Sequence, residues 1–257
     1  MAWLGLDVGT TAAKTLLVDS DGRVLGRTSS GYEELTASCR QAGEQDPARW
    51  IGAIIAALRL MPGDELARVG GVGIVGQTPT LTLLDEMLQP VRSAITWQDA
   101  RAKSEAAELS RVFGDPNELV GTNLPWSPVN NPAKLLWLSR HEPDVVSRSR
   151  WIVEPKDYVG SYLTGRVATD CWSSKGIVDV RSSQPVTSLL DFCGWQTRHV
   201  PEVLSPWDQA GAVTVDAARE LRIPPGVPVA VGWSDACAGM LPLGVLSEPA
   251  AFIISGT

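Results

Sequence analysis

The sequence predicts an α/β fold in which helices flank a mixed central sheet. Three observations indicate this fold. Three apolar runs with strand-like spacing open the chain within residues 3–28, and a segment with helical periodicity follows at residues 47–58. Beyond it, short apolar runs alternate with helix-like segments to residue 254. An order of strands, one helix and then alternation is typical of helices packed on a partly parallel sheet.

The first three predicted strands cover residues 3–8, 14–19 and 24–28. Asp21-Gly22 separates the second from the third and is typical of a tight hairpin turn. The chain between the first two, residues 9–11, is a glycine followed by two threonines, and it connects strand to strand. Glycine allows a ligand close to the backbone, and N–H and hydroxyl groups there can face phosphate oxygens. Asp7 adds a carboxylate able to hold hydrated Mg²⁺, so the turn favours nucleotide-phosphate chemistry.

A helix is predicted next, with Asp46 as its N-cap and Pro47 at its first position. Its apolar face is formed by Trp50, Ile51, Ile54, Ile55 and Leu58. Pro62-Gly63 ends it. Residues 69–75 predict a buried strand, and residues 81–84 with 91–96 predict a hairpin.

Helical patterns return at residues 100–113, from residue 131, and at residues 156–163. Residues 166–211 are expected to be loops with short helices. The last predicted elements are strands at 213–215, 229–231 and 250–254, with helices from Asp216 and Ser234. This order is that of the ribonuclease-H-like, actin-type ATPase fold. Such a fold normally starts a second, similar lobe near the final strand.

Composition narrows the function classes. The chain has 257 residues, 44% of them hydrophobic, and a net charge of −7, which argues against a nucleic-acid footprint. No apolar run approaches the roughly 18 residues of a membrane helix, and no signal peptide is expected. The four cysteines lack CxxC spacing and indicate reduced thiols in a cytoplasmic protein. Most of the ten tryptophans are expected in the core.

Several motifs, in this order along the chain, resemble the FGGY carbohydrate kinases, whose members include xylulokinase, glycerol kinase and gluconokinase. The resemblance covers residues 4–257, which would form the N-terminal, sugar-binding lobe (1–247) and the start of a second lobe (248–257). The motifs are Asp7-x-Gly-Thr-Thr-x-x-Lys14, Gly76-Gln77, Ile95-Thr-Trp97-Gln-Asp99-Ala-Arg101, Lys134-Leu-Leu-Trp137, Lys156-Asp157-Tyr158, Leu163-Thr-Gly165, Thr169-Asp170, Gly232-Trp-Ser-Asp235 and Ser255-Gly256-Thr257.

The resemblance implies ATP-dependent phosphorylation of a sugar or polyol hydroxyl, with ATP and Mg²⁺ as cofactors. It implies Asp235 as the catalytic base and Asp7 as the metal ligand. The implied substrate contacts are Gln77, Thr78, Trp97, Asp99 and Arg101. The implied phosphate contacts are Gly9, Thr10, Thr11, Lys14, Gly256 and Thr257. Phosphoryl transfer asks a protein mainly for positioning and charge neutralisation, which suits these residue types.

Each assignment has a structural alternative. Asp235 precedes a predicted helix, where an aspartate is commonly an N-cap. Asp7 alone would suit a hairpin turn, Trp97 a core position, and Asp99 with Arg101 a surface ion pair. Lys134 and Lys156-Asp157 are interpreted as structural residues.

Gly71-x-Gly73-x-x-Gly76 matches the dinucleotide fingerprint but lies within a predicted strand. That fingerprint needs a helix N-terminus for the pyrophosphate, and Pro79 follows in a turn instead. Two other functions stay open: a sugar-binding or regulatory module without transfer, and another actin-type ATPase. The G-x-x-D and W-x-D-x-R segments disfavour the second, because such ATPases need no sugar base.

The sequence departs from the xylulokinase pattern at the substrate loop and after the base. Thr78-Pro79 stands where Met-His is usual, and Ala236 where Asn is frequent. Sugar discrimination depends on buried polar partners for hydroxyls, so the sugar itself is left open. Because adenine contacts would belong to a C-terminal lobe, we expect negligible kinase activity from these 257 residues alone. We also expect an apolar face that supports homodimers.

Overall fold

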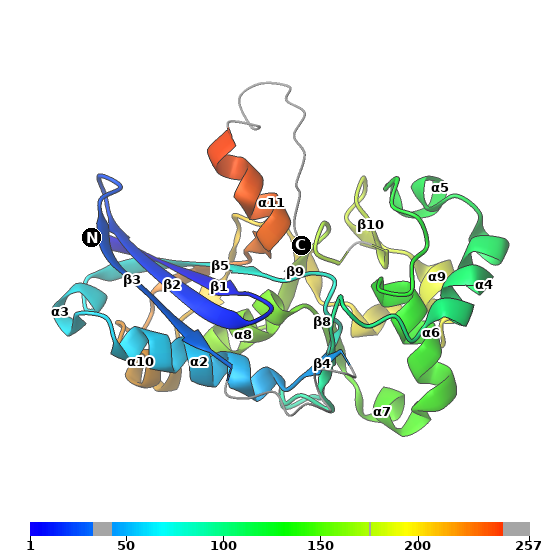
Figure 1. Ribbon diagram of the computed structural model, residues 1–257, viewed down its shortest axis with the longest axis horizontal. Coiled ribbons are helices and arrows are strands. Elements are labelled where there is room, and N and C mark those ends of the chain that lie inside the picture. The colour runs from blue at the N-terminus through cyan, green and yellow to red at the C-terminus, as the bar shows by residue number, and fades with distance from the viewer. Residues whose placement is uncertain (33–42, 175, 244–257) are drawn as a thin grey trace.

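The computed structural model describes residues 1–32, 43–174 and 176–243, and its main element is a mixed sheet (Figure 1). This seven-stranded sheet has the spatial order β13-β14-β5-β1-β2-β3, with β15 also paired to β5. Its strands are β1 (Ala2–Val8), β2 (Ala12–Asp19), β3 (Val24–Gly31), β5 (Val69–Gly76), β13 (Gln209–Ala212), β14 (Pro228–Ala230) and β15 (Trp233–Ser234). The predicted mixed central sheet is confirmed.

Strand β5 is the centre of the parallel part of the sheet. It pairs in parallel with β1, β14 and β15, whereas β2 and β3 continue from β1 as antiparallel hairpins. The chain turns between β2 and β3 at Gly22, whose φ of 80° suits the predicted tight turn. Because β1, β5 and β15 run the same way, their carboxyl ends lie at one edge of the sheet.

Helices cover one face of this sheet, on its lower side in Figure 1: α2 (Pro47–Arg59), α8 (Pro155–Thr164) and α10 (Val215–Leu221). Helix α2 begins as predicted, because the Asp46 side chain accepts a hydrogen bond from the Ala48 N–H at 3.0 Å and Pro47 follows. Its apolar stripe, which includes Trp50 and Ile54, is buried with Leu4 and Leu6 of β1 in the first hydrophobic core.

A second core lies among helices in the right-hand half of Figure 1. Leu109, Leu135 and Trp195 are buried there. The helices of this half are α4 (Lys103–Phe113), α5 (Pro116–Val120), α6 (Asn131–His141), α7 (Pro143–Arg148) and α9 (Thr187–Phe192). Short antiparallel pairs accompany them, β4 (Glu44–Gln45) with β7 (Ala94–Ile95) and β6 (Thr82–Leu84) with β8 (Trp151–Val153).

The remaining described elements are short. They are α3 (Gly63–Leu66), β9 (Ala168–Asp170) paired with β12 (Glu202–Leu204), β10 (Val178–Asp179) paired with β11 (Gln184–Pro185), the 3-10 turns η1 (Thr197–His199) and η2 (Leu241–Leu243), and α11 (Asp235–Met240). The region 166–211, expected to be loops and short helices, therefore also contains strands. No helix in the described ranges is long and apolar enough to cross a membrane.

Two predicted strands are placed differently in the structure. Residues 81–84 meet residues 90–95 through two isolated bridges, Leu81–Ile95 and Leu84–Pro90, and through a bond from the Val91 N–H to the Leu83 carbonyl at 3.0 Å, but their ladder runs to β8. The strand at 213–215 is wrong, because Thr214 caps helix α10 by accepting a bond from the Ala217 N–H, and Val215 is helical. The predicted strand at 250–254 lies outside the described residues.

The tryptophan expectation is also wrong. Only Trp50 and Trp195 are buried among the ten, all of which fall within the described residues. Trp3, Trp97 and Trp207 are exposed, at 46%, 40% and 72% of their surface. Trp3 sits on the face of β1 that the helices leave uncovered, since its neighbours Ala2 and Leu4 point into the core. Trp126, Trp137 and Trp151 are partly buried and pack against the two cores, so the tryptophans divide between the cores, their edges and the exposed surface.

Candidate active site

The register of the parallel strands brings three predicted site segments to one sheet edge. Val8 at the end of β1 pairs with Gly76 at the end of β5, and Gly76 pairs with Ser234 at the end of β15. The next residue along each strand is Gly9, Gln77 and Asp235 respectively. Neighbouring strands lie about 4.8 Å apart, so these three positions sit side by side at the same edge.

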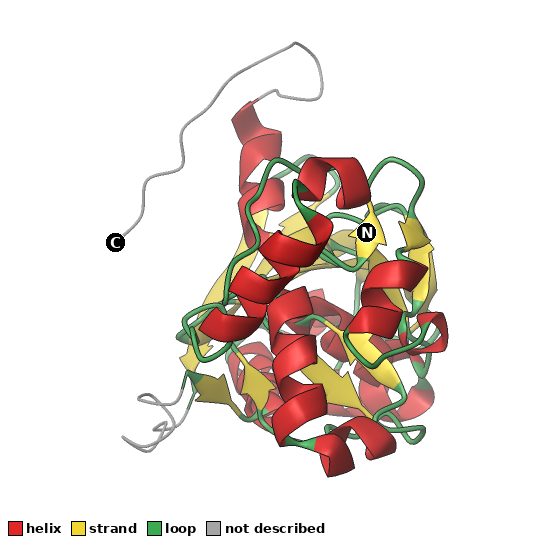
Figure 2. Ribbon diagram, turned by 90° about the vertical axis from the view of Figure 1, so that its right-hand side faces the viewer, coloured by secondary structure: helices red, strands yellow, loops and turns green. Residues whose placement is uncertain are grey.

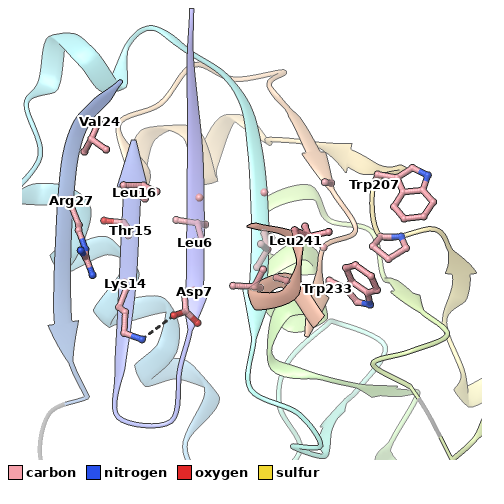
Figure 3. A pocket seen from close by; sticks show the side chains of 18 residues that line it. Leu6, Asp7, Lys14, Thr15, Leu16, Val24, Arg27, Trp207, Trp233 and Leu241 are labelled. Carbon is pink, nitrogen blue, oxygen red and sulfur yellow. Dashed lines mark hydrogen bonds and ion pairs between the residues drawn. The ribbon is translucent and has the colours of Figure 1, made fainter. Parts of the chain in front are cut away.

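The β1–β2 turn is flanked by Asp7, predicted as the metal ligand, and Lys14, predicted as a phosphate contact. Asp7 and Lys14 are cross-strand partners, and Lys14 Nζ lies 3.0 Å from Asp7 Oδ2 (Figure 3). The Gly9 N–H donates to the Ala12 carbonyl at 3.2 Å and closes the turn. A Cβ at Gly9 would stand 3.1 Å from that carbonyl oxygen, so glycine allows the tight closure.

Asp7 has one carboxylate oxygen committed and one without a partner. Oδ2 accepts from Lys14, whereas Oδ1 is buried and has no hydrogen-bond partner among the described residues. The described residues contain no group of three acidic, histidine or cysteine side chains that could hold a metal. A single carboxylate still fits Mg²⁺, which keeps several waters and takes further oxygens from substrate phosphates.

Asp235 is the first residue of α11 and is exposed. The N-cap of this helix is Ser234, whose side chain accepts a bond from the Cys237 N–H at 3.2 Å. The alternative that Asp235 is the cap is therefore wrong. Its Oδ1 accepts from the Ala236 N–H at 2.7 Å.

A hollow of about 870 Å³ lies beside this edge, over the sheet face that α2, α8 and α10 do not cover (Figure 3). Asp7 and Lys14 line it from the hairpin, and Trp233 and Ala238, on either side of Asp235 in the chain, line it from the last strand and helix. Figure 1 shows α11 on the opposite side of the sheet from α2, α8 and α10, and in Figure 2 it projects at the top of the molecule. The hollow is therefore lined by Asp7 itself and by residues on either side of Asp235, while Asp235 is not one of its lining residues.

Gln77 leads the loop after β5 and is buried. Its Nε2 donates to the Gly9 carbonyl at 3.3 Å and to Gln45 Oε1 at 2.8 Å, so the amide nitrogen is used within the protein. Its Oε1 is buried without a partner among the described residues. Thr78 follows in a cis peptide with Pro79. No helix follows β5 directly, which agrees with rejecting the dinucleotide fingerprint.

The W-x-D-x-R segment lies next to the hairpin. Trp97 is partly exposed, and its indole N–H donates to Thr10 Oγ1 at 3.0 Å. Asp99 is buried and accepts from the Arg101 guanidinium at 2.7 Å. Arg101 also pairs with Glu44 at 2.8 Å. The structure thus joins Trp97 to the β1–β2 turn, while Asp99 and Arg101 are partners of one another.

The other predicted phosphate contacts divide into two groups. Thr11 is exposed at the hairpin tip beside Thr10. Gly256 and Thr257 lie outside the described residues, as does the proposed boundary at 248–257. The roles of all these site residues stay predictions.

Sequence reasoning interpreted Lys134 as structural but missed Glu154, and both are buried beside the loop after β5. Lys134 Nζ donates to the carbonyls of Pro79, Ile95 and Thr96 at 3.0, 3.1 and 3.0 Å. Glu154 accepts from the Thr80 N–H at 2.7 Å. Burial lowers the pKa of Lys134 to about 8 and raises the pKa of Glu154 to about 8. These two side chains hold the two polar groups of the Pro79–Thr80 peptide, directly after the Thr78-Pro79 bond, as a structural role predicts.

A second buried network supports the strand that leads to Asp235. Lys156 Nζ lies 2.5 Å from Asp157 Oδ1, 2.9 Å from Asp170 Oδ2 and 3.3 Å from the Val231 carbonyl. All three charged side chains are fully buried. Burial alone would lower the pKa of Lys156, but the two carboxylates raise it, so the ammonium is retained.

The chain is similar to known proteins over nearly its whole length. The N-terminal domain of the FGGY family of carbohydrate kinases matches residues 2–242. A xylulose kinase of Lactococcus lactis is 30% identical over 259 residues, which are 99% of this chain and 51% of that protein. A xylulose kinase of Klebsiella pneumoniae is 32% identical over 260 residues, 99% of this chain and 53% of that protein. The chain spans about half the length of these relatives.

Solved structures give the same result for the fold. A xylulose kinase from Brucella ovis superposes with a TM-score of 0.84 at 30% identity, covering 93% of this chain and 49% of that one. A xylulose kinase from Rhodospirillum rubrum gives 0.84 at 28% identity, with 95% and 52% covered. The actin-type arrangement of the sheet and its helices is therefore confirmed.

Proposed function

Because the chain belongs to the FGGY family of carbohydrate kinases, we propose that it forms the sugar-binding half of an enzyme that phosphorylates a sugar or polyol with ATP. The observation that carries this proposal is the strand register that aligns Gly9, Gln77 and Asp235 at one edge, beside a hollow lined by Asp7 and Lys14. The acceptor needs a site beside Gln77 and Asp235, and the phosphate tail of ATP needs an adjacent site at the turn between Asp7 and Lys14.

In the proposed reaction, the acceptor hydroxyl lies against Asp235 and the γ-phosphate against the hairpin. The Asp235 carboxylate takes the hydroxyl proton as the oxygen–phosphorus bond forms, and ADP leaves with the electrons of the broken bond. Lys14 and the turn N–H groups offset phosphate charge. When bound, Mg²⁺ supplies further neutralisation, and Asp7 would hold it. General-base assistance is typically worth about 10²–10⁴-fold in rate.

A ketopentose is the first candidate substrate, since the relatives above are named xylulose kinases. Thr78-Pro79 and Ala236 provide fewer polar partners than the xylulokinase pattern, so other ketoses and polyols belong in the test. ATP, Mg²⁺, a C-terminal partner half and a cytoplasmic setting complete the proposal.

A thermal-shift screen of the 257-residue chain tests sugar binding. Pentuloses, hexuloses, polyols and aldonates are added in turn, and one class is expected to raise the melting temperature. A ligand at 100 times its Kd adds about 2.7 kcal/mol of stability. The Asp235→Ala variant should lose most of the shift. Asp216→Ala is the matched control, because Asp216 occupies the first turn of α10 with 88% of its side chain exposed.

Two results would contradict the proposal. One is the absence of a shift with every class of acceptor. The other is an equal shift in the Asp235→Ala and Asp216→Ala variants, which would place the binding site elsewhere.

A further inference from the structure

Gln45 joins the phosphate turn to the loop after β5. Its Nε2 donates to the Thr10 carbonyl at 2.7 Å. Its Oε1 accepts from Gln77 Nε2 at 2.8 Å and from Trp50 Nε1 at 3.0 Å. Gln45 is only 4% exposed, so water does not compete for these bonds. One amide group therefore contacts both segments that the proposed reaction must bring together.

The chemistry of the partners fixes the direction of this chain of bonds. An indole N–H only donates and a backbone carbonyl only accepts, so Gln45 must present Oε1 to Trp50 and Nε2 to Thr10. Gln77 must then donate to Gln45 Oε1. That orientation leaves Gln77 Oε1 as a buried acceptor without a partner among the described residues, a state that costs free energy unless a donor arrives.

The backbone on both sides of Gln45 is held in place. Gln45 pairs with Ala94 in the β4–β7 ladder, and the next residue is Asp46, the N-cap of α2. On the other side, Glu44 pairs with Arg101 at 2.8 Å and also with Arg92. A side chain extended from such a fixed position transmits displacement better than one on a loop.

We infer that Gln45 is the positioning residue that couples the phosphate turn to the acceptor loop, an inference that rests on the proposed function. It holds the Thr10 carbonyl of the turn, and it sets the amide orientation of Gln77. The direct bond from Gln77 to Gly9 is longer, at 3.3 Å, so Gln45 carries the main link. Binding of phosphate at the turn then changes the hydrogen bonding of the Gln77 side chain through Gln45.

Magnesium pyrophosphate, titrated into the ¹⁵N-labelled 257-residue chain, serves as the probe for the turn. In the wild type it should shift the backbone amides of residues 9–11 and, with the same apparent Kd, the side-chain NH₂ signals of Gln45 and Gln77. In Gln45→Met, pyrophosphate should bind about tenfold more weakly, and the Gln77 signals should no longer respond. A residue that only supported the fold would lower stability without removing the response at Gln77.

Gln209→Met is the matched control, because Gln209 donates from Nε2 to the Gly211 carbonyl at 3.1 Å on β13, away from the turn. It should keep the wild-type affinity and response. An unchanged affinity in Gln45→Met, or a Gln77 response that persists there, would overturn the inference. If Gln45→Met does not fold, the wild-type signals decide: Gln45 and Gln77 amides that stay unmoved while the turn amides shift would overturn it.

The failure of the proposed function looks different. In that case pyrophosphate shifts no turn amide even in the wild type. Hydrogen exchange then tests the positioning role without ligand. Faster exchange in Gln45→Met confined to residues 9–12 and 77–80 supports it, and wild-type rates at these amides overturn it.

Discussion

At the residue scale, Gly232 allows the chain that leads to Asp235 to pass very close to the backbone of β5. Its φ is 80°, in the left-handed region, and a Cβ there would stand 2.0 Å from the Ile74 carbonyl oxygen. No side-chain rotation relieves a clash with backbone. The glycine lets the chain pass β5 at contact distance immediately before β15, and so it sets where Asp235 emerges.

Gly232→Ala should therefore destabilise the protein strongly. The clash and the unfavourable φ together predict a loss of about 3 kcal/mol or more in the free energy of unfolding, measured by urea titration. Gly239→Ala is the matched control, since a Cβ there meets nothing within 4 Å. Equal stability of the two variants would show that the turn at Gly232 relaxes freely.

Asp235→Asn separates binding from transfer. In a full-length kinase that contains this chain, the amide keeps the size and hydrogen bonding of the side chain but takes up no proton. Phosphoryl transfer should fall by about 10²–10⁴-fold while the sugar Kd changes little. A coupled ADP-release assay and a sugar titration measure the two quantities. Turnover at the wild-type rate would exclude Asp235 as the base.

The sequence predicted the site residues that belong to a motif. It missed those, such as Gln45, that are recognised only by their position in the folded structure. Asp7 and Lys14, which belong to one motif, pair at the hairpin, and Trp97, predicted as a substrate contact, donates to Thr10 of the same turn. Gln45 gave no comparable signal, because a glutamine before a helix cap looks like surface. Its burial depends on the β4–β7 pair, which joins segments 50 residues apart and leaves no local pattern.

At the element scale, the loop after β5 depends on buried side chains from two helices. Lys134 of α6 holds the Pro79 carbonyl, and Glu154, the N-cap of α8, holds the Thr80 N–H. Glu154 also accepts from Asn131 Nδ2 at 2.7 Å. The loop is thus fixed by elements that come much later in the chain.

The ionisation of Glu154 makes stability depend on pH. Burial raises the pKa of Glu154 from its ordinary 4.5 to about 8, so the folded protein holds a proton that the unfolded chain has released. The proton on Glu154 therefore adds to the free energy of unfolding. The added stability is complete below about pH 4.5 and is lost as the pH rises toward 8, by up to about 1.4 kcal/mol per pH unit. Urea midpoints of Glu154→Gln should fall less between pH 5 and 8 than those of the wild type.

Glu154→Gln is a fair test because the site can accommodate an amide. Asn131 Oδ1 is buried without a partner among the described residues, so a reoriented Asn131 can accept from the new NH₂ group. Parallel pH profiles for the variant and the wild type would contradict the assignment.

Elements were predicted well where local signals agree and poorly where pairing is distant. Helix α2 has a cap, a proline and an apolar stripe, and its predicted start is confirmed. Strand β6 has an apolar run like that of a hairpin, but its partner β8 lies far along the chain. At residues 213–215, a threonine cap outweighed the β-propensity of two valines.

At the scale of the whole molecule, the sheet has one covered and one open face. Leu16 and Val24 are exposed on the open face, at 40% and 56%, and both line the hollow. Lys14 and Arg27 lie among them (Figure 3). Exposed apolar area of this kind usually contacts another protein surface.

Leu16→Lys should reduce self-association of the 257-residue chain, because a charge on the open face opposes burial of that face. Sedimentation velocity over a range of concentrations measures it. Val112→Lys is the matched control, since Val112 is similarly exposed, at 46%, but lies on α4 in the other half. A wild type that stays monomeric at all concentrations, or equal behaviour of both variants, would contradict the prediction.

The 257-residue chain should have negligible kinase activity on its own. It spans about half the length of its relatives, and closure of two halves around the substrates normally completes such sites. A steady-state assay at saturating ATP, with the acceptor found by thermal shift, measures this. Turnover close to that of a full-length kinase would show that one half suffices.

The shared register of β1, β5 and β15 has a consequence for how such an enzyme can change its acceptor. Two inter-strand steps, about 10 Å in all, separate the turn after β1 from the residue after β15, and main-chain bonding sets that span. Replacing side chains therefore leaves the distance between the turn after β1 and the residue after β15 unchanged. Acceptors of different length must be accommodated in the loops that extend from the edge, which makes those loops the place to engineer new selectivity.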